Sequence, residues 1–316
     1  MLNENSIFTL SFFKKIQLYD NMNPNVRRAN LELHFAVLLY GFTAILGVLI
    51  ELPALVLVWW RVTITLSAML IYGNIPLKMK HLSKKDRVNL MGIGVVVGLH
   101  WIAFFGAGKL ANASIALVAF ATTSFMSSFL EPLLMRQKIK WYEVALGLVI
   151  VPAMTYVVGT LPANMGVGVG VALISAFLAV IFSILNKKMT LKTDPLSISF
   201  FNLSGAWLLL TLLLPFYFNA EPNAKFLPTF NDWIFLMVLA LLCTNLGYWL
   251  GIRSLRHLSA FSVALTVNLE PVYGIIFAWL ILKEDKQLNP SFYIGASVII
   301  VAVLGYPFLK SMFDKK

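Results

Sequence analysis

The sequence predicts an all-α membrane protein with ten transmembrane helices, arranged as two inverted five-helix repeats. Composition, the recurrence of apolar spans and an internal repeat lead to this prediction. Of the 316 residues, 59% are hydrophobic and only 12% are charged, and the mean hydropathy is +0.81. Soluble domains contain about 25% charged residues. The composition therefore excludes a soluble globular fold and makes a lipid bilayer the expected surrounding.

Apolar runs of about 20 residues, long enough to cross a bilayer as helices, recur from end to end. The polar segments between them are too short for a soluble domain. Segments 1–30 and 311–316 are predicted to be cytosolic tails, and Met22 is an alternative start site. The ten predicted spans cover residues 33–50, 53–73, 88–108, 111–135, 141–161, 166–186, 196–218, 233–252, 258–282 and 290–309.

Lysine and arginine are distributed unevenly between the two sides of these spans. With the N-terminus inside, 20 of the 25 fall in inward segments, four in outward segments, and Arg61 within a span. Cytoplasmic loops of membrane proteins carry such an excess. We therefore expect a multi-pass protein of an inner membrane with both termini in the cytoplasm. The same bias accounts for the net charge of +11, so no nucleic-acid partner is expected.

The chain also repeats itself at an offset of 148 residues. This single offset aligns the third to fifth spans with the eighth to tenth without a gap. The two halves, 31–162 and 163–310, contain five spans each. Because five is odd, the second half enters the membrane upside down relative to the first. Inverted repeats of this kind are typical of secondary transporters, with the substrate near the midplane. The aligned identities include Trp101 with Trp249, Ser114 with Ser262 and Gly147 with Gly295.

The ninth span carries a glutamate at its midpoint. Glu270 lies about 18 Å of helix rise from either end, and a carboxylate at that depth costs roughly 2.5–3.5 kcal/mol on insertion scales. Pro271 follows and lacks an amide hydrogen, which leaves the carbonyl of Val267 without its helical partner. Two interpretations stay open. Glu270 binds a proton or a cationic group and changes partner during transport, or it is a permanently paired acid that joins two helices.

The third and eighth spans bring polar and aromatic residues to equivalent depths under the same offset. His100 aligns with Tyr248, and each is followed by the shared tryptophan. Asn245 lies one turn before Trp249. An aromatic wall with a few polar groups suits a pocket for a small amphipathic metabolite, and ordinary helix packing is the alternative.

Arg61 and Asn268 complete the candidate set. Arg61 is either deep in the membrane, facing an acid such as Glu270 or a substrate carboxylate, or an interfacial anchor beside Trp59 and Trp60. Asn268 lies two residues from Glu270 on another helix face. The predicted substrate-binding residues are therefore His100, Trp101, Asn245, Tyr248, Trp249, Asn268, Glu270 and Arg61.

Several local sequences match one family. They are Leu269-Glu270-Pro271, the run AWLILKED at 278–285, Gly295, Trp60-Arg61, and LSKKD at 82–86. With these motifs, residues 31–310 resemble the drug/metabolite transporter superfamily, and specifically an EamA-type permease. The resemblance implies a secondary transporter that exports a small organic metabolite such as an amino acid. The first half departs from the pattern, because Thr123 stands where the offset would place a partner of Pro271.

The sequence lacks a Gly-rich phosphate loop, His-Glu-x-x-His, Gly-x-Ser-x-Gly and paired metal-ligand clusters. We therefore expect no cofactor, no metal and no enzymatic activity. The lone Cys243 rules out an intramolecular disulfide. Two rivals remain: a membrane-embedded enzyme that uses His100 with Glu131 or Glu270 on a lipid substrate, and a non-transporting scaffold. Partners are a small-molecule substrate, the bilayer and, through Glu270, protons. The substrate, the direction of transport and the oligomeric state stay open.

Overall fold

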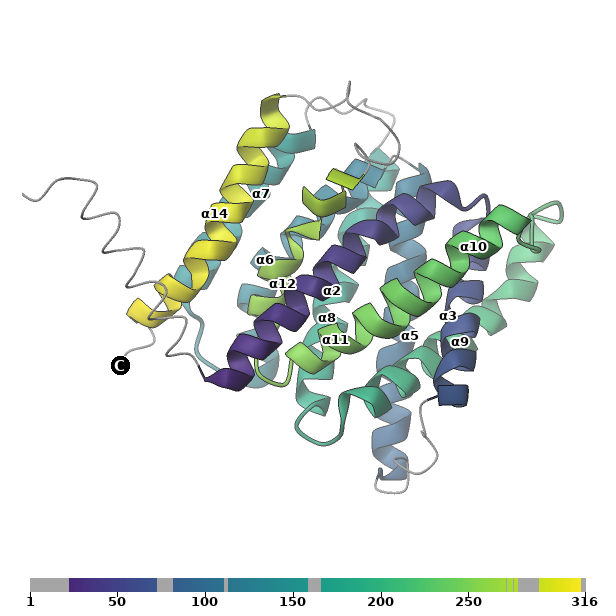
Figure 1. Cartoon of the computed structure of the whole chain (residues 1–316), viewed down its shortest axis with the longest axis horizontal. Helices are drawn as coiled ribbons and strands as arrows, with labels where there is room; N and C mark the ends of the chain where they lie inside the picture. Colours follow the sequence, from purple (N-terminus) through teal and green to yellow (C-terminus); the bar gives the residue numbers. More distant parts are fainter. Residues whose placement is uncertain are drawn as a thin grey trace, which may run out of the picture.

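The protein is a single bundle of helices (Figure 1). The computed structural model describes residues 23–72, 82–110, 113–158, 166–270, 272–274, 276–277 and 290–313, and all regular structure in these ranges is helical. The prediction of an all-helical protein is thus confirmed for this part of the chain. Met22, Pro271 and the 278–285 run lie outside the described residues.

The helices coincide with the predicted spans. In the first half they are α2 (Pro24–Leu49), α3 (Ala54–Tyr72), α5 (Lys84–Leu110), α6 (Ala113–Met135) and α7 (Trp141–Val158). In the second half they are α8 (Gly166–Met189), α9 (Pro195–Ala220), α10 (Phe230–Val238), the π-helical η3 (Leu239–Leu246), α11 (Gly247–Ser254), α12 (Ala260–Val267) and α14 (Pro290–Phe313).

Six helical segments of the described chain are long and apolar enough to cross a membrane by length and composition. They are α2, α3, α5, α8, α9 and the continuous helix formed by α10, η3 and α11. The count of ten spans stays a prediction, since six segments of the described chain meet the criterion.

The first helix begins earlier than hydropathy predicts. Asn23 accepts a hydrogen bond from the amide of Asn25 (3.0 Å), and Pro24 occupies the first helical position. Both features favour a helix start. Hydropathy misses this start because Arg27 and Arg28 lie in the first turns.

The predicted span 258–282 is not one helix. α12 ends at Val267, and Asn268 and Leu269 form a turn before Glu270. The break precedes Pro271, which cannot donate the amide hydrogen bond that the Val267 carbonyl would accept. Glu270 therefore lies beside a backbone break, as the proline at position 271 led us to expect.

Helix packing follows the offset of 148 residues. This offset places α2 on α8, α3 on α9, and α5 on the α10–η3–α11 helix. It also places α6 on α12 and α7 on α14. α2 packs against α11 as α8 packs against α5, and α3 packs against η3 as α9 packs against α5. The pairs α3–α9, α6–α12 and α7–α14 map onto themselves. α2 and the α10–α11 helix run side by side in opposite directions (Figure 1). This pattern supports the two-repeat proposal.

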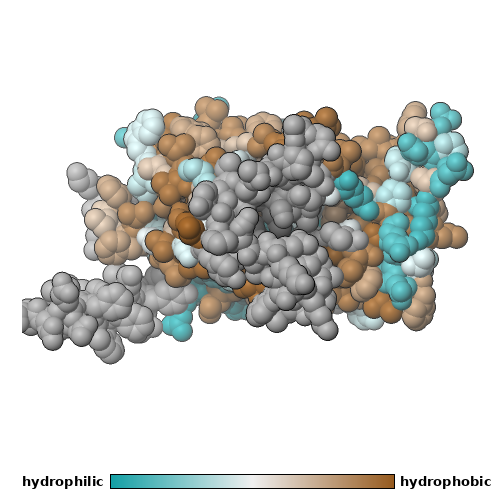
Figure 2. Space-filling model, turned by 90° about the horizontal axis from the view of Figure 1, so that it is seen from above, coloured by the Kyte–Doolittle hydropathy of each residue, from teal (hydrophilic) through white to brown (hydrophobic). Residues whose placement is uncertain are grey.

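The surface suits a lipid environment. Among the residues coloured in Figure 2, apolar side chains prevail, and hydrophilic residues gather toward the right-hand end. Many large apolar side chains are more than half exposed, among them Leu212, Phe216 and Val301. Lipid tails can cover such side chains, whereas water could not do so without cost.

Two glycines bring α5 and α9 into backbone contact. A methyl group on Gly94 would overlap the carbonyl of Asn202, and one on Gly205 would overlap the carbonyl of Met91. Small residues permit this close approach between helices in membranes.

Gly94→Ala is therefore expected to destabilise the protein by about 1–3 kcal/mol through overpacking. The measurement is the thermal unfolding temperature of the purified protein in detergent. Gly92→Ala is the matched control, since a methyl group there would meet nothing within 4 Å. Equal unfolding temperatures for Gly94→Ala and the wild type would contradict the packing account.

Candidate functional site

A cavity of about 130 Å³ lies inside the bundle, with walls from α2, α3, α5, α6, α8, α11 and α12. It is close to the roughly 150 Å³ of an engineered cavity that binds benzene, so it can accept a small organic molecule. Its aromatic wall consists of Tyr40, Trp101, Phe104, Phe120, Phe182 and Tyr248.

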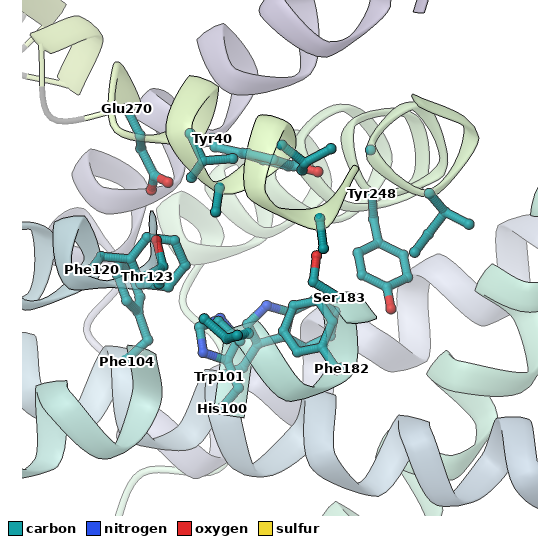
Figure 3. Close-up of a pocket in the computed structure, with 18 of the residues that line it drawn as sticks. Tyr40, His100, Trp101, Phe104, Phe120, Thr123, Phe182, Ser183, Tyr248 and Glu270 are labelled. Carbon is teal, nitrogen blue, oxygen red and sulfur yellow. The ribbon is translucent and has the colours of Figure 1, made fainter. Parts of the chain in front are cut away.

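Five of the eight predicted residues line this cavity. Figure 3 shows Glu270 at one side of the space and Tyr248 at the other, with His100 and Trp101 below them. Arg61 is the fifth. The structure therefore gathers residues from spans two, three, eight and nine at one place.

The other three predicted residues do not line the cavity. The Asn268 side-chain amide donates to the Ser124 hydroxyl across the α6–α12 contact (3.0 Å). Trp249 lies 5.2 Å from the guanidinium of Arg253. Asn245 is half-buried on η3 and outside the cavity wall.

Arg61 is a buried cation on α3, with only 3% of its surface exposed. Its Nε donates to the hydroxyl of Thr244, and its guanidinium carbon lies 4.4 Å from the centre of the Trp101 ring. Its Nη1 has no hydrogen-bond partner among the residues that the structure describes. This burial favours the deep interpretation of Arg61 over the interfacial one.

Glu270 is a buried acid in the same cavity and is 5% exposed. Within the described ranges its carboxylate makes no hydrogen bond or ion pair, not even with Arg61. A helix-locking acid would have a permanent partner. Its surroundings in the described residues favour the interpretation in which Glu270 exchanges partners.

His100 is held at the cavity by Ser175. Its Nδ1 lies 2.9 Å from both the carbonyl oxygen and the hydroxyl oxygen of Ser175. Because the carbonyl can only accept, its contact favours the tautomer with the hydrogen on Nδ1, in which Nε2 is an acceptor. The Ser175 hydroxyl in turn donates to the His100 carbonyl (3.1 Å).

The cavity contains several unsatisfied polar atoms. Buried polar groups almost always have a partner, so each exception requires an explanation. In the described part of the chain five buried side-chain atoms lack one, and three of them belong to residues that line the cavity. Those three are Arg61 Nη1, Thr123 Oγ1 and Ser127 Oγ. A bound ligand or water would satisfy them.

Tyr248 is fixed by two asparagines that the sequence analysis did not single out. Its hydroxyl accepts from the side-chain amide of Asn202 on α9 (2.9 Å) and from that of Asn186 on α8 (3.3 Å). The two asparagines also bond to each other (2.7 Å). Polar residues within apolar spans were the available signal for both.

The turn between α11 and α12 closes one end of the cavity, with Leu255 and Ala260 in the wall. A buried carboxylate and a partly buried ammonium hold this turn. The Glu131 carboxylate accepts from the amides of Ala260 (2.9 Å) and Phe261 (2.8 Å). The Lys187 ammonium donates to the carbonyls of Leu255 (2.5 Å) and Leu258 (2.7 Å). Glu131 thus caps α12.

A separate set of contacts, outside the cavity wall, joins the α2–α3 connection to the start of α10. Asp232 accepts from the amide of Glu51 (2.9 Å), and Asp232 and Thr229 form the capping box of α10. Lys225 lies 3.1 Å from the Glu51 carboxylate, and this hydrogen bond raises the pKa of Lys225.

These features define a polytopic helical membrane protein with a polar, aromatic-lined cavity between its two halves. Residues 166–306 match the model of the EamA-like transporter family. The proteins of that family are membrane transporters, and the match does not specify a substrate. No group of three or more potential metal ligands occurs within the described ranges.

The fold is shared with a protein of known structure. One crystal structure matches 91% of this chain and 99% of its own length with a TM-score of 0.71. The sequence identity is 16%, so the match shows the fold alone. A comparison with curated proteins finds no match.

The cavity should admit small reagents. In a Cys243→Ser background, Ser183→Cys in the cavity wall is expected to react with a small thiol reagent at least about tenfold faster than Ser199→Cys, because only accessible thiolates react readily. Ser199 is the control, since it is 1% exposed and bonded to the Pro195 carbonyl on α9. Equal rates in the two variants would contradict an accessible cavity.

Proposed function

We propose that the protein is a secondary transporter that exports a small organic metabolite, such as an amino acid or a related compound. It alternates between inward-open and outward-open states as its two inverted halves rock about the cavity. The proposal places it in an inner membrane with both termini in the cytoplasm. The observation that carries it is the cavity itself, where the buried polar side chains of Arg61, His100 and Glu270 share one aromatic-lined space.

The chemistry of the wall suits a small amphipathic solute. Arg61 supplies a positive charge, Glu270 supplies an acid, and His100 supplies a neutral acceptor. Six aromatic side chains provide the apolar contact that fixes the body of such a ligand. A solute with one anionic and one cationic group would satisfy both buried charges at once.

The experiment is a panel of metabolites scored by thermal shift on the purified protein. Each hit is then tested for uptake into vesicles that contain the protein, and the recovered solute is analysed. Transport of an unchanged solute supports the proposal. Chemical conversion of a lipid or solute would support the membrane-enzyme alternative, and a protein that neither binds nor moves any solute would support the scaffold.

Glu270 is the proposed site of proton coupling. A buried carboxylate without a fixed partner is costly as an anion. Binding a proton in one state and a substrate cation in the other would neutralise it in both. The backbone break before Pro271 is a point next to Glu270 at which the chain after α12 can bend.

Glu270→Gln is expected to abolish the response of vesicle transport to an imposed pH gradient, because glutamine cannot bind the proton. Exchange at equal pH on both sides should persist at a reduced rate. Glu32→Gln is the control, since Glu32 forms surface ion pairs with Arg28 and Arg253. Wild-type transport that ignores the gradient, together with an equally active Glu270→Gln, would contradict proton coupling.

The α11–α12 turn is the proposed cytoplasmic gate. It lies at the end that carries Arg253 and Arg256, which the charge bias places inside. A glutamine in place of Glu131 can accept from the α12 amides through one oxygen only. The NH2 group of the glutamine would then face the other backbone N–H of α12, and two donors cannot form a hydrogen bond with each other.

Glu131→Gln and Lys187→Gln are each expected to raise cytoplasmic labelling of Ser183→Cys by about tenfold, as loss of a charged hydrogen bond of 1.5–3 kcal/mol would allow. The measurement uses an impermeant thiol reagent on inverted and right-side-out vesicles. Lys192→Gln is the control, because Lys192 pairs with Asp86 in an exposed bridge at the same end (2.9 Å). Labelling that rises from the opposite side would overturn this assignment of the gate.

A further inference from the structure

We infer that Arg61 is a preorganised anchor for the carboxylate of the transported solute, and that Thr244 of the π-helical segment η3 is the residue that positions it. The inference rests on the proposed function and deepens it. It assigns one part of the cavity to a chemical group, and it gives a role to a local backbone irregularity.

The π-helical turn brings the Thr244 hydroxyl to Arg61. That hydroxyl donates to the carbonyl of Leu239, five residues earlier and at the start of η3 (2.7 Å). With its hydrogen used in this way, its oxygen is left to accept from Arg61 Nε. π-Helical turns are frequent at functional sites, because the wider turn displaces side chains from their α-helical positions.

A second contact joins α3 to the same irregular segment. The hydroxyl of Thr65, one turn after Arg61, lies between the carbonyls of Ala240 in η3 (3.0 Å) and Arg61 (2.8 Å), which share its one hydrogen. The backbone that carries Arg61 is therefore tied to η3 independently of the guanidinium. Both threonines are fully buried.

The aromatic neighbours fix the plane of the guanidinium. Its carbon lies 4.4 Å from the centre of the Trp101 ring and 5.7 Å from that of Phe105. Thr244 occupies Nε, and the enclosed Nη1 has no partner in the described part of the protein, so the terminal end of the guanidinium is the part that still needs one. Arginine presents parallel N–H groups that match the two oxygens of a carboxylate.

The anchor leaves room for a second polar contact on the same solute. Glu270 lines the cavity without an ion pair to Arg61, so a carboxylate on Arg61 and a cationic group toward Glu270 can be bound together. The occupant that fits both is a small zwitterionic carboxylate with an apolar body of about the size of a benzene ring.

The test compares two probes that differ in one group, phenylalanine and phenylalaninamide. Their dissociation constants are measured with purified protein in nanodiscs. Thr244→Val keeps the shape of the side chain and removes the acceptor. It is expected to weaken phenylalanine binding about 10- to 100-fold, the size of a hydrogen bond to a charged group. Phenylalaninamide binding should change little.

Thr244→Ser keeps the hydroxyl and should restore the wild-type preference for the carboxylate. Thr65→Val is the matched control, because it removes a buried threonine hydroxyl that bonds η3 and does not touch the guanidinium. A purely structural role of Thr244 would weaken both probes equally, and that result would overturn the positioning role.

Arg61→Leu separates this inference from the proposed function. Loss of the carboxylate preference in Arg61→Leu supports the anchor. An unchanged preference, or a wild-type protein that binds both probes equally or binds neither, would overturn the anchor. Transport itself would still be decided by the vesicle panel, so failure of one does not imply failure of the other.

Discussion

The buried guanidinium of Arg61 is the interaction on which the rest of the site depends. A charge inside the bilayer is costly unless its N–H groups are satisfied, and here the protein satisfies them only in part. Thr244 and the Trp101 face fix the side chain, and no acid is placed against it. The incomplete hydrogen bonding of Arg61 gives one reason why the cavity, the π-helical turn and the aromatic wall occur together. In the proposed function all three surround this cation, and the transported solute is its remaining partner.

The second half contains a broken helix, whose backbone groups need hydrogen-bond partners inside the membrane. α12 has only eight residues, and both of its ends need partners in a medium without water. Glu131 caps its start from α6, and the carbonyls before it are bound by Lys187 from α8. Because Glu131 belongs to the first half and α12 to the second, movement of one half against the other would change this contact. The cap that satisfies the first amides of α12 therefore also links this helix to the other half of the protein.

Most of the fold could be predicted from the sequence. Hydropathy marks the helices because a bilayer requires apolar spans, and the offset repeat indicates how the two halves are related. Arg61, His100, Trp101, Tyr248 and Glu270 were predictable as expensive or aromatic residues in mid-span. The sequence could not predict that Asn268 bonds to Ser124, since this depends on the break before Glu270. It also could not indicate η3, because a π-helical turn has no pattern of its own. The partners of Glu131 could not be predicted, because they are backbone amides far along the chain.

The central claim is that the buried charges of the cavity hold one solute between the two halves. The most direct test is a cryo-EM structure of the protein with bound phenylalanine in nanodiscs. The account predicts ligand density in the cavity, with the carboxylate at the terminal nitrogens of Arg61 and the ring among Phe120, Phe182 and Tyr248. Ligand bound elsewhere, with Arg61 paired directly to Glu270 across a closed cavity, would contradict it.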